Sequence, residues 1–269
     1  MNDNKRVVLV TGAAGGIGAA ITQALIADGH SVAAIDRDAA ALERLKSSDR
    51  IHPFLIDLAS VTACQEAVAS SVAYFGRLDA VINNAGIGPS SLRPDGEAKL
   101  PRIEELTADI WDNFFAINVR APMLIAQAAL PHMRKGGFGR IINNTTSYRT
   151  MHRVLPYGAT KAALESMSTI WAQELDGDGI TVNVLIPGGP TDTPFIGDGA
   201  GWDRAKMLRP EIMGPPARWL ISDDAANYTG QRIIAAKWDA ALPGMQAAVK
   251  AGRASGWPEL GADAVWLQS

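Results

Sequence analysis

The feature that most constrains this chain is a regular alternation of short, apolar, β-branched runs with longer segments of helical periodicity. Such an alternation is typical of a parallel sheet that carries helices on both of its faces. It continues without a linker-like break, so we expect a single α/β domain over residues 1–269. The expected strands are Val7–Val10, Ser31–Ile35, Ile51–Ile56, Ala80–Asn83, Arg140–Thr145, Thr181–Ile186 and Gln231–Ala235.

Two segments do not follow the alternation. Gly88–Pro101 is rich in proline, glycine and charged residues, which predicts a loop between two regular elements. Residues from about 240 to 269 show little periodicity, which predicts an irregular tail at the end of the domain.

The composition narrows the classes of function. Twenty-five basic and 28 acidic residues, mixed along the chain, give a net charge of −3, which argues against a nucleic-acid partner. The single cysteine, Cys64, excludes an intrachain disulfide, and four scattered histidines argue against a zinc site. No uninterrupted apolar run approaches the roughly 20 residues of a membrane span, and the first strand begins too early for a signal peptide. We expect a cytoplasmic protein that binds neither metal nor membrane.

A glycine-rich turn, Thr11–Gly18, follows the first expected strand and opens the first expected helix. A pyrophosphate can approach backbone N–H groups at a helix N-terminus only where side chains do not block it. Gly12, Gly16 and Gly18, with Ile17 between the last two, provide the tight turn, the close approach and the close helix–strand packing. The alternative is a compact strand–helix turn with no ligand. The position of the glycine-rich turn, after the first strand and at the start of the domain, favours a dinucleotide site.

Two aspartates stand where later strands end. Asp36 lies 18 residues beyond Gly18, and its carboxylate is placed to accept the ribose hydroxyls of an adenosine and to repel a 2′-phosphate. This favours NAD, although the neighbouring Arg37 could pair with the 2′-phosphate of NADP. Asp57, followed by Leu58, is placed to meet the adenine edge. Either aspartate could instead cap a helix.

The order of the motifs resembles that of the short-chain dehydrogenase/reductase family. The resemblance covers about residues 5–235. It implies a doubly wound parallel (Rossmann) sheet of seven strands, NAD or NADP across the carboxyl ends of the strands, and a homodimer or homotetramer. It also implies that Asn84, Ala85, Gly86, Pro187 and Gly188 contact the cofactor. The matching motifs are Thr11–Gly18, Asn83-Asn84-Ala85-Gly86, Asn118, Tyr157-Gly-Ala-Thr-Lys161 and Asn183–Gly188.

Tyr157 and Lys161 lie four residues apart, which places both side chains on one face of a helix. An ammonium near a phenol stabilises the phenolate, so we expect Lys161 to lower the pKa of Tyr157 toward the working pH. Tyr157 would then be a general acid/base for an alcohol–carbonyl pair. The resemblance implies that Lys161 also binds the nicotinamide ribose and that Asn118 belongs to a proton relay.

The chain departs from the family pattern at the hydroxyl that binds the substrate oxygen. Counted from Gly139, the position of the usual serine falls on Thr146, with Ser147 next, and the connection to Tyr157 is about two residues short. A threonine hydroxyl can donate the same hydrogen bond. Strand alternation upstream of the shortening favours Thr146 over Ser147.

Two more departures lie near the expected substrate. Pro190 occupies the position whose N–H would bind the nicotinamide carboxamide, so Thr191 would have to take this role by a register shift. The Gly88–Pro101 loop is about ten residues longer than the family pattern. It either shapes the substrate site or is a tolerated surface insertion.

These observations favour an NAD-dependent oxidoreductase that interconverts a secondary alcohol and a carbonyl compound. One alternative is a non-catalytic NAD-binding sensor, which the changed serine position and Pro190 would suit. Another is an isomerase or dehydratase on the same scaffold, because a fold does not determine the reaction.

Overall fold

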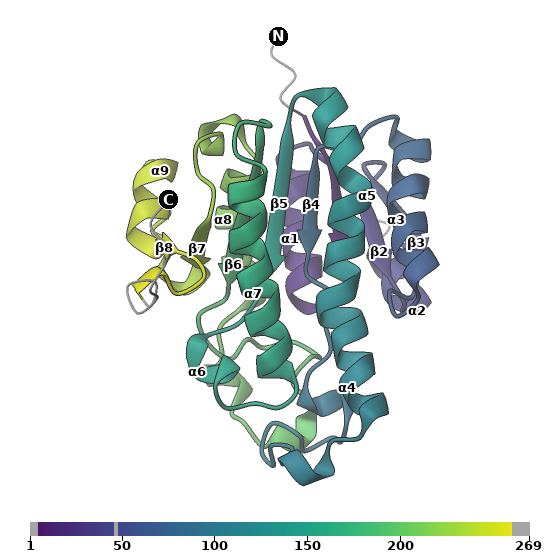
Figure 1. Cartoon of the computed structure of the whole chain (residues 1–269), viewed down its shortest axis with the longest axis vertical. Helices are drawn as coiled ribbons and strands as arrows, with labels where there is room; N and C mark the ends of the chain where they lie inside the picture. Colours follow the sequence, from purple (N-terminus) through teal and green to yellow (C-terminus); the bar gives the residue numbers. More distant parts are fainter. Residues whose placement is uncertain (1–4, 46–47, 260–269) are drawn as a thin grey trace, which may run out of the picture.

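The computed structural model describes residues 5–45 and 48–259 (Figure 1). One eight-stranded sheet runs through it in the order β3-β2-β1-β4-β5-β6-β7-β8. The seven expected strands are all present, each within one residue of its predicted ends, and they are parallel. The strands are β1 (Val7–Thr11), β2 (Ser31–Asp36), β3 (Ile51–Leu55), β4 (Ala80–Asn83), β5 (Gly139–Asn144), β6 (Ile180–Ile186), β7 (Gln231–Ile234) and β8 (Gly252–Ala254).

Helices cover both faces of the sheet, as the alternation predicts (Figure 1). The helices are α1 (Gly16–Ala27), α2 (Ala39–Leu45), α3 (Val61–Phe75), α4 (Ala108–Phe115), α5 (Ala121–Gly136), α6 (Tyr148–Met151), α7 (Tyr157–Glu174), α8 (Gly214–Leu220) and α9 (Gly244–Ala251), with a π-helical segment at Ala116–Arg120. Short 3₁₀ turns lie at Pro89–Ser91, Ile103–Glu105, Asp198–Ala200, Arg204–Lys206, Pro210–Met213, Asp223–Ala225 and Ala235–Lys237.

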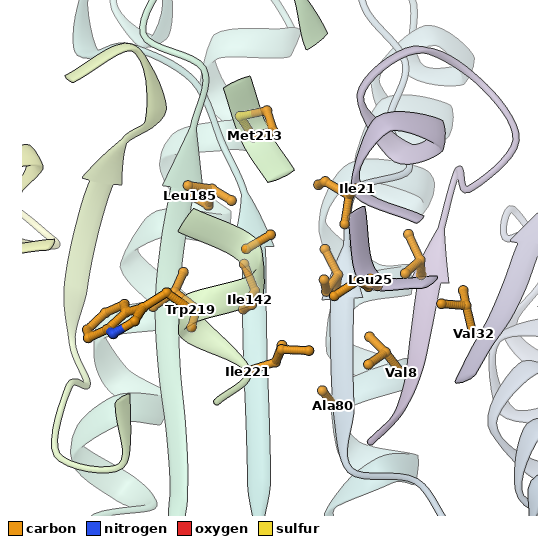
Figure 2. Packing of buried hydrophobic residues seen from close by; sticks show 14 of the residues in the cluster. Val8, Ile21, Leu25, Val32, Ala80, Ile142, Leu185, Met213, Trp219 and Ile221 are labelled. Carbon is orange, nitrogen blue, oxygen red and sulfur yellow. The ribbon is translucent and has the colours of Figure 1, made fainter. Parts of the chain in front are cut away.

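Two hydrophobic clusters, one on each face of the sheet, form the core. Side chains alternate along β1: Val8 and Val10 join the cluster under α1 and α8, whereas Leu9 joins the cluster under α3, α5 and α7. Figure 2 shows the first cluster, with Ile21 of α1 pointing toward the sheet. Because both faces are buried, the strands read as continuous apolar runs.

The strand order places a crevice beside β1. β1 pairs with β2 on one side and with β4 on the other, so the connections that leave the carboxyl ends of β1 and β4 diverge to opposite faces. Ligands of doubly wound sheets bind in the crevice at such a reversal. The glycine-rich turn after β1 lies at this position.

The expectation of an irregular C-terminal tail is wrong for residues 244–254, and its part over 260–269 lies outside the described residues. Helix α9 packs on the sheet through Ala248, and β8 pairs antiparallel with β7, which adds an eighth strand. The Tyr228 hydroxyl donates a hydrogen bond to the Ala248 carbonyl at 3.2 Å. Short alanine- and glycine-rich segments carry little periodicity, so packing rather than pattern determines their structure.

A continuous helical stretch, Ala108–Gly136, runs from α4 through the π-helical segment into α5. Its most apolar window has a mean hydropathy of 1.3, so by length and composition alone it could cross a membrane. We did not identify it from uninterrupted apolar runs, because polar residues are interspersed. In the fold, 56% of that window is buried, and α5 packs against the sheet (Figure 1). A helix in the core of a folded domain can be as long and as apolar as a membrane-spanning helix.

The Gly88–Pro101 segment is a loop with one 3₁₀ turn, as predicted, and it packs against residues that follow β6. The Ser90 hydroxyl accepts a hydrogen bond from the Gly197 N–H at 2.8 Å. The ring of Phe195 lies over Gly88, where an added Cβ would come within 2.3 Å of it. The two loops therefore form one wall at the carboxyl end of the sheet.

Candidate active site

A cavity of about 880 Å³ opens at the carboxyl ends of the strands. The glycine-rich turn, the ends of β2 and β5, the start of α7, the loop after β6 and the Gly88–Pro101 loop all contribute to its walls. The structure brings together all of the expected site residues at this cavity except Gly18 and Asn118, which support it from behind. The expected residues that line it are Gly12, Gly16, Ile17, Asp36, Arg37, Asp57, Leu58, Asn84, Ala85, Gly86, Thr146, Ser147, Tyr157, Lys161, Pro187, Gly188 and Thr191.

The turn Thr11–Gly18 needs glycine for two separate reasons. Gly12 and Gly16 have φ values of +60° and +49°, in the left-handed region that side chains disfavour. A Cβ on Gly18 would lie 1.9 Å from the Gly12 carbonyl oxygen, so only glycine allows α1 to start this close to β1. The glycines thus determine how closely the start of α1 approaches β1 at the cavity wall.

The N-terminus of α1 fits the pyrophosphate of a dinucleotide. Among the described residues no side chain caps this helix, and its first turn contains no acidic residue. The unpaired N–H groups of a helix N-terminus attract anions. Gly15, the N-cap residue, lines the cavity, so a phosphate could reach these groups without obstruction by a side chain.

Asn84 fixes the glycine-rich turn from the end of β4. Its Nδ2 donates hydrogen bonds to the carbonyls of Thr11 and Gly12 at 3.1 and 3.2 Å. The Thr11 hydroxyl accepts hydrogen bonds from the N–H groups of Asn84 and Ala85, both at 3.0 Å. Asn144 at the end of β5 donates to Asn84 Oδ1 at 2.9 Å. Asn144 lines the cavity as well, although no sequence motif pointed to it.

Asp36 and Asp57 do not cap the helices that follow them. The Asp36 carboxylate accepts hydrogen bonds from the N–H groups of Ala14, Arg37 and Asp38 at its place on the cavity wall. The first turn of α2 is capped by Asp38, and α3 is capped by Ser60. Asp57 accepts a hydrogen bond from the Ala59 N–H, within the loop that leads to α3. The helix-cap alternatives are therefore wrong.

Tyr157 and Lys161 lie on the same face of α7, with the Lys161 ammonium 5.8 Å from the centre of the Tyr157 ring. Lys161 Nζ donates a hydrogen bond to the Asn144 carbonyl at 2.8 Å, and burial lowers its pKa to about 8. Burial raises the pKa of Tyr157 well above its ordinary value, while a hydrogen bond with the Thr146 side chain acts in the opposite direction. The expected lowering by Lys161 is wrong for this arrangement, because desolvation dominates both groups.

Asn118 lies behind Gly86 in the π-helical segment and is fully buried. Its Nδ2 donates hydrogen bonds to the Ile87 carbonyl and the Thr160 hydroxyl, and its Oδ1 accepts one from the Ile87 N–H. A Cβ on Gly86 would lie 3.1 Å from Asn118 Oδ1 and 3.4 Å from Lys161 Nζ. Asn118 and Lys161 therefore both lie close to Gly86, and of the two Lys161 lines the cavity.

Thr146 and Ser147 have different surroundings. The Thr146 side chain interacts with the phenol of Tyr157, and this interaction lowers the pKa of Tyr157. Ser147 is the N-cap of α6: its hydroxyl accepts a hydrogen bond from the Thr150 N–H and lies 2.9 Å from the Thr150 hydroxyl. Of the two, Thr146 is therefore the residue that interacts with Tyr157.

The loop after β6 contributes Pro187, Gly188 and Thr191 to the cavity wall. Thr191 is buried and forms an isolated bridge with Leu208, in which the Pro190 carbonyl and the Asp192 N–H make the hydrogen bonds. The N–H of Thr191 itself makes neither of the two hydrogen bonds of this bridge. This is the N–H group that the register shift at Pro190 requires.

Several cavity residues were not identified from the sequence. Phe195 packs 5.5 Å from the Tyr157 ring, measured between ring centres, and Trp202 lies further along the same loop. Glu97 and Leu100 come from the Gly88–Pro101 loop, so this loop forms part of the cavity wall and is not only a surface insertion. The Glu97 carboxylate accepts hydrogen bonds from the N–H and the hydroxyl of Ser90. Only the unusual length of the loop signalled such a role.

Comparisons with known proteins agree with this geometry. The family model described as short chain dehydrogenase matches residues 6–199. D-threitol dehydrogenase of Mycolicibacterium smegmatis is 32% identical over 247 residues, covering 85% of this chain and 90% of the relative. A probable galactose dehydrogenase of Rhizobium meliloti is 32% identical over 247 residues, covering 85% of this chain and 93% of the relative.

Solved structures show the same architecture with nicotinamide cofactors bound. A 3-ketoacyl-(acyl-carrier-protein) reductase of Brucella melitensis, complexed with NADH, gives a TM-score of 0.71 at 26% identity, covering 83% of this chain and 93% of that one. A blue fluorescent protein from a metagenomic library, complexed with NADPH, gives a TM-score of 0.71 at 30% identity, covering 85% and 95%. The glycine-rich turn, the Tyr157–Lys161 pair and these similarities lead to one conclusion: the chain belongs to the short-chain dehydrogenase family of oxidoreductases.

Proposed function

We propose that this protein is an NAD-dependent dehydrogenase that interconverts a secondary alcohol and its ketone, with Tyr157 as the general acid/base. The observation that carries the proposal is the meeting of Thr146, Tyr157 and Lys161 on one wall of the cavity that also contains the glycine-rich turn. A phenol and a second hydroxyl directed at one point can together hold the oxygen of a carbonyl substrate.

The residues that would hold NAD follow the cavity wall from one side to the other. The glycine-rich turn and the N-terminus of α1 would bind the pyrophosphate, and Asp36 would accept the hydroxyls of the adenosine ribose. Asp57 and Leu58 would border the adenine, while Lys161 and the Thr191 N–H would bind the nicotinamide end. When bound, the nicotinamide supplies or accepts the hydride. NAD is favoured over NADP because the Asp36 carboxylate would face a 2′-phosphate.

The proton moves at the Tyr157 hydroxyl. The raised pKa keeps the Tyr157 hydroxyl protonated near neutral pH, so that its proton is available for transfer to a carbonyl oxygen. In the oxidative direction the same group must first lose its proton, so oxidation should need a more alkaline solution than reduction. Lys161, whose ammonium lies 5.8 Å from the centre of the Tyr157 ring, and the buried Asn118 would belong to the proton relay that leads to Tyr157.

The cavity combines apolar and polar walls around the reacting position. Phe195, Leu100 and Trp202 provide an apolar surface, and Glu97, together with the exposed Arg149, provides hydrogen-bonding groups. This mixture suits a small alcohol with further polar substituents. The polyol and sugar named for two relatives, threitol and galactose, belong in the first substrate panel.

A homodimer or homotetramer is the proposed assembly, in the cytoplasm, without a nucleic-acid or membrane partner. Helix α5, which follows Asn118, exposes Met123, and α7, which begins at Tyr157, exposes Ile170; 40% and 57% of their surfaces are accessible. Exposed large apolar side chains on long helices favour association between copies. Light scattering at micromolar concentration should give at least twice the mass of one chain, and a monomer would contradict the assembly.

The experiment is a turnover assay at the absorbance band of reduced nicotinamide, with a panel of secondary alcohols, polyols and their ketones. Turnover that disappears in Tyr157→Phe supports the proposal. Binding of NAD without turnover on any compound would favour the sensor alternative instead. Conversion of a compound without net change in reduced nicotinamide would favour an isomerase or a dehydratase.

A further inference from the structure

A buried ion pair, Glu165 with Arg232, lies behind the cavity and takes no part in the proposed proton transfer. The two side chains are 0% and 1% accessible, although they come from separate elements, α7 and β7. Burial of two charges is costly, and an apolar pair of similar volume often gives the same or a higher stability. The pair therefore needs an explanation other than the stability of the fold.

Glu165 connects α7 to the end of β5. One carboxylate oxygen accepts hydrogen bonds from Arg232 Nη1 and, at 2.9 Å, from the Thr145 hydroxyl. The other oxygen accepts a hydrogen bond from the Tyr148 hydroxyl at 3.2 Å. The residues on both sides of Thr146 and Ser147 are thus held by a single carboxylate.

Arg232 completes the connection by holding Thr146 itself. Its Nη2 donates a hydrogen bond to the Thr146 carbonyl at 2.5 Å, while Nη1 is occupied by Glu165. Its guanidinium also stacks on the Tyr148 ring, 4.4 Å from the ring centre. A guanidinium can donate in both directions at once from one rigid plane.

The spacing along α7 relates this pair to the reacting groups. Tyr157, Lys161 and Glu165 follow one another at four-residue intervals, so they lie on the same face of the helix. Lys161 holds the Asn144 carbonyl, and Glu165 holds the Thr145 hydroxyl. Every residue from Asn144 to Thr146 is therefore tied to α7, directly or through Arg232.

We propose that Glu165 and Arg232 are positioning residues, which fix the Thr146 hydroxyl against the Tyr157 hydroxyl. The inference rests on the proposed function of Thr146 and Tyr157. The connection from Thr146 to Tyr157 is about two residues shorter than the family pattern, so its geometry depends on such fixed points. Catalytic groups work efficiently only when neighbouring residues hold them in the productive geometry.

Arg232→Lys tests the inference, because one ammonium can keep the pairing with Glu165 but cannot also reach the Thr146 carbonyl from a second nitrogen. We expect kcat to fall at least about tenfold, with KM for NAD within about threefold of the unmodified value. The pH profile of alcohol oxidation should also move to higher pH, because the Thr146 hydrogen bond that lowers the pKa of Tyr157 is weakened. A purely structural role would change neither kcat nor the profile of the folded protein.

Arg140→Lys is the matched control. Arg140 is an equally buried arginine on β5, but it donates to the carbonyls of Gly139, Gly179 and Ser222 at the opposite end of the strand. This variant should lower the thermal unfolding midpoint without changing kcat per folded molecule. If Arg232→Lys does not fold, Glu165→Gln serves instead, since it keeps the volume and removes the charge.

The outcomes separate the inference from the proposed function. Unchanged kcat and an unchanged pH profile in the folded Arg232→Lys protein, or in folded Glu165→Gln where that variant replaces it, overturn the inference while the dehydrogenase assignment stands. An equal fall of kcat in Arg140→Lys also overturns it, because any buried arginine would then act alike. An unmodified protein without turnover on any substrate overturns the proposed function, and the inference with it.

Discussion

Replacement of Thr146 by valine removes one hydroxyl group and leaves the shape of the side chain unchanged. Valine keeps the branched shape of threonine, so packing after β5 is preserved, and only the hydroxyl that interacts with Tyr157 is lost. The backbone carbonyl of Thr146 remains available to Arg232. We therefore expect the fold and the affinity for NAD to be little changed.

The expected magnitude follows from the position of the hydroxyl. Removal of one oriented donor to a reacting oxygen typically costs about 2.7–4 kcal/mol of transition-state stabilisation when water is excluded. Thr146 is half-buried on the wall of an open cavity, so the lower end of that range applies. At about 1.4 kcal/mol for each factor of ten, kcat should fall roughly a hundredfold.

The assay is steady-state turnover at the band of reduced nicotinamide, recorded across pH with the same alcohol. Because the Thr146 hydrogen bond lowers the pKa of Tyr157, its loss should raise that pKa further and move oxidation to higher pH. Ser147→Ala is the control. It removes the N-cap of α6 and should lower stability by about 0.5–2 kcal/mol with a much smaller effect on kcat.

The opposite pattern would refute the reasoning. If Ser147→Ala lowers kcat a hundredfold and Thr146→Val does not, the reacting oxygen is bound one residue further along the chain. If neither variant matters but Tyr157→Phe abolishes turnover, Tyr157 and ordered water hold the oxygen. If Tyr157→Phe is harmless too, the dehydrogenase mechanism is wrong.

Three further predictions concern the cofactor site and Lys161. Gly18→Ala should lower the free energy of unfolding by about 1–3 kcal/mol in thermal or denaturant unfolding, because its Cβ would lie 1.9 Å from the Gly12 carbonyl oxygen; Gly15→Ala, whose Cβ meets no described atom within 4 Å, should not. Asp36→Ala should reduce the ratio of NAD to NADP affinity at least about tenfold in a titration, and tighter binding of NADP by the unmodified protein would contradict the assignment. The pKa of Lys161 is lowered to about 8, so the unfolded chain binds more protons than the folded one between that pH and about 10. Stability relative to Lys161→Met should therefore rise with pH in this window, by up to about 1.4 kcal/mol per pH unit, and parallel curves would show that Lys161 is not desolvated.

Much of the site follows from local sequence. The strands were predictable because burial on both faces makes them continuous apolar runs, and the glycine-rich turn because backbone geometry and close approach leave only glycine at Gly12 and Gly18. Helical spacing alone places Tyr157 and Lys161 on one face. The preference for Thr146 over Ser147, drawn from strand alternation, stays a prediction; Thr146 interacts with Tyr157, and Ser147 caps α6.

Other features depended on contacts between residues far apart in the chain. The pKa of Tyr157 is raised rather than lowered because desolvation, a property of the folded surroundings, exceeds the influence of its hydrogen bond with Thr146. The connection of Arg232 to Thr146 spans 86 residues of sequence, and the eighth strand exists only because β7 offers an edge. Sequence pattern thus determined the elements and the positions of the proposed reacting groups, through periodicity and backbone sterics. Their burial, pairing and charge state arose only when tertiary packing removed water and brought distant segments together.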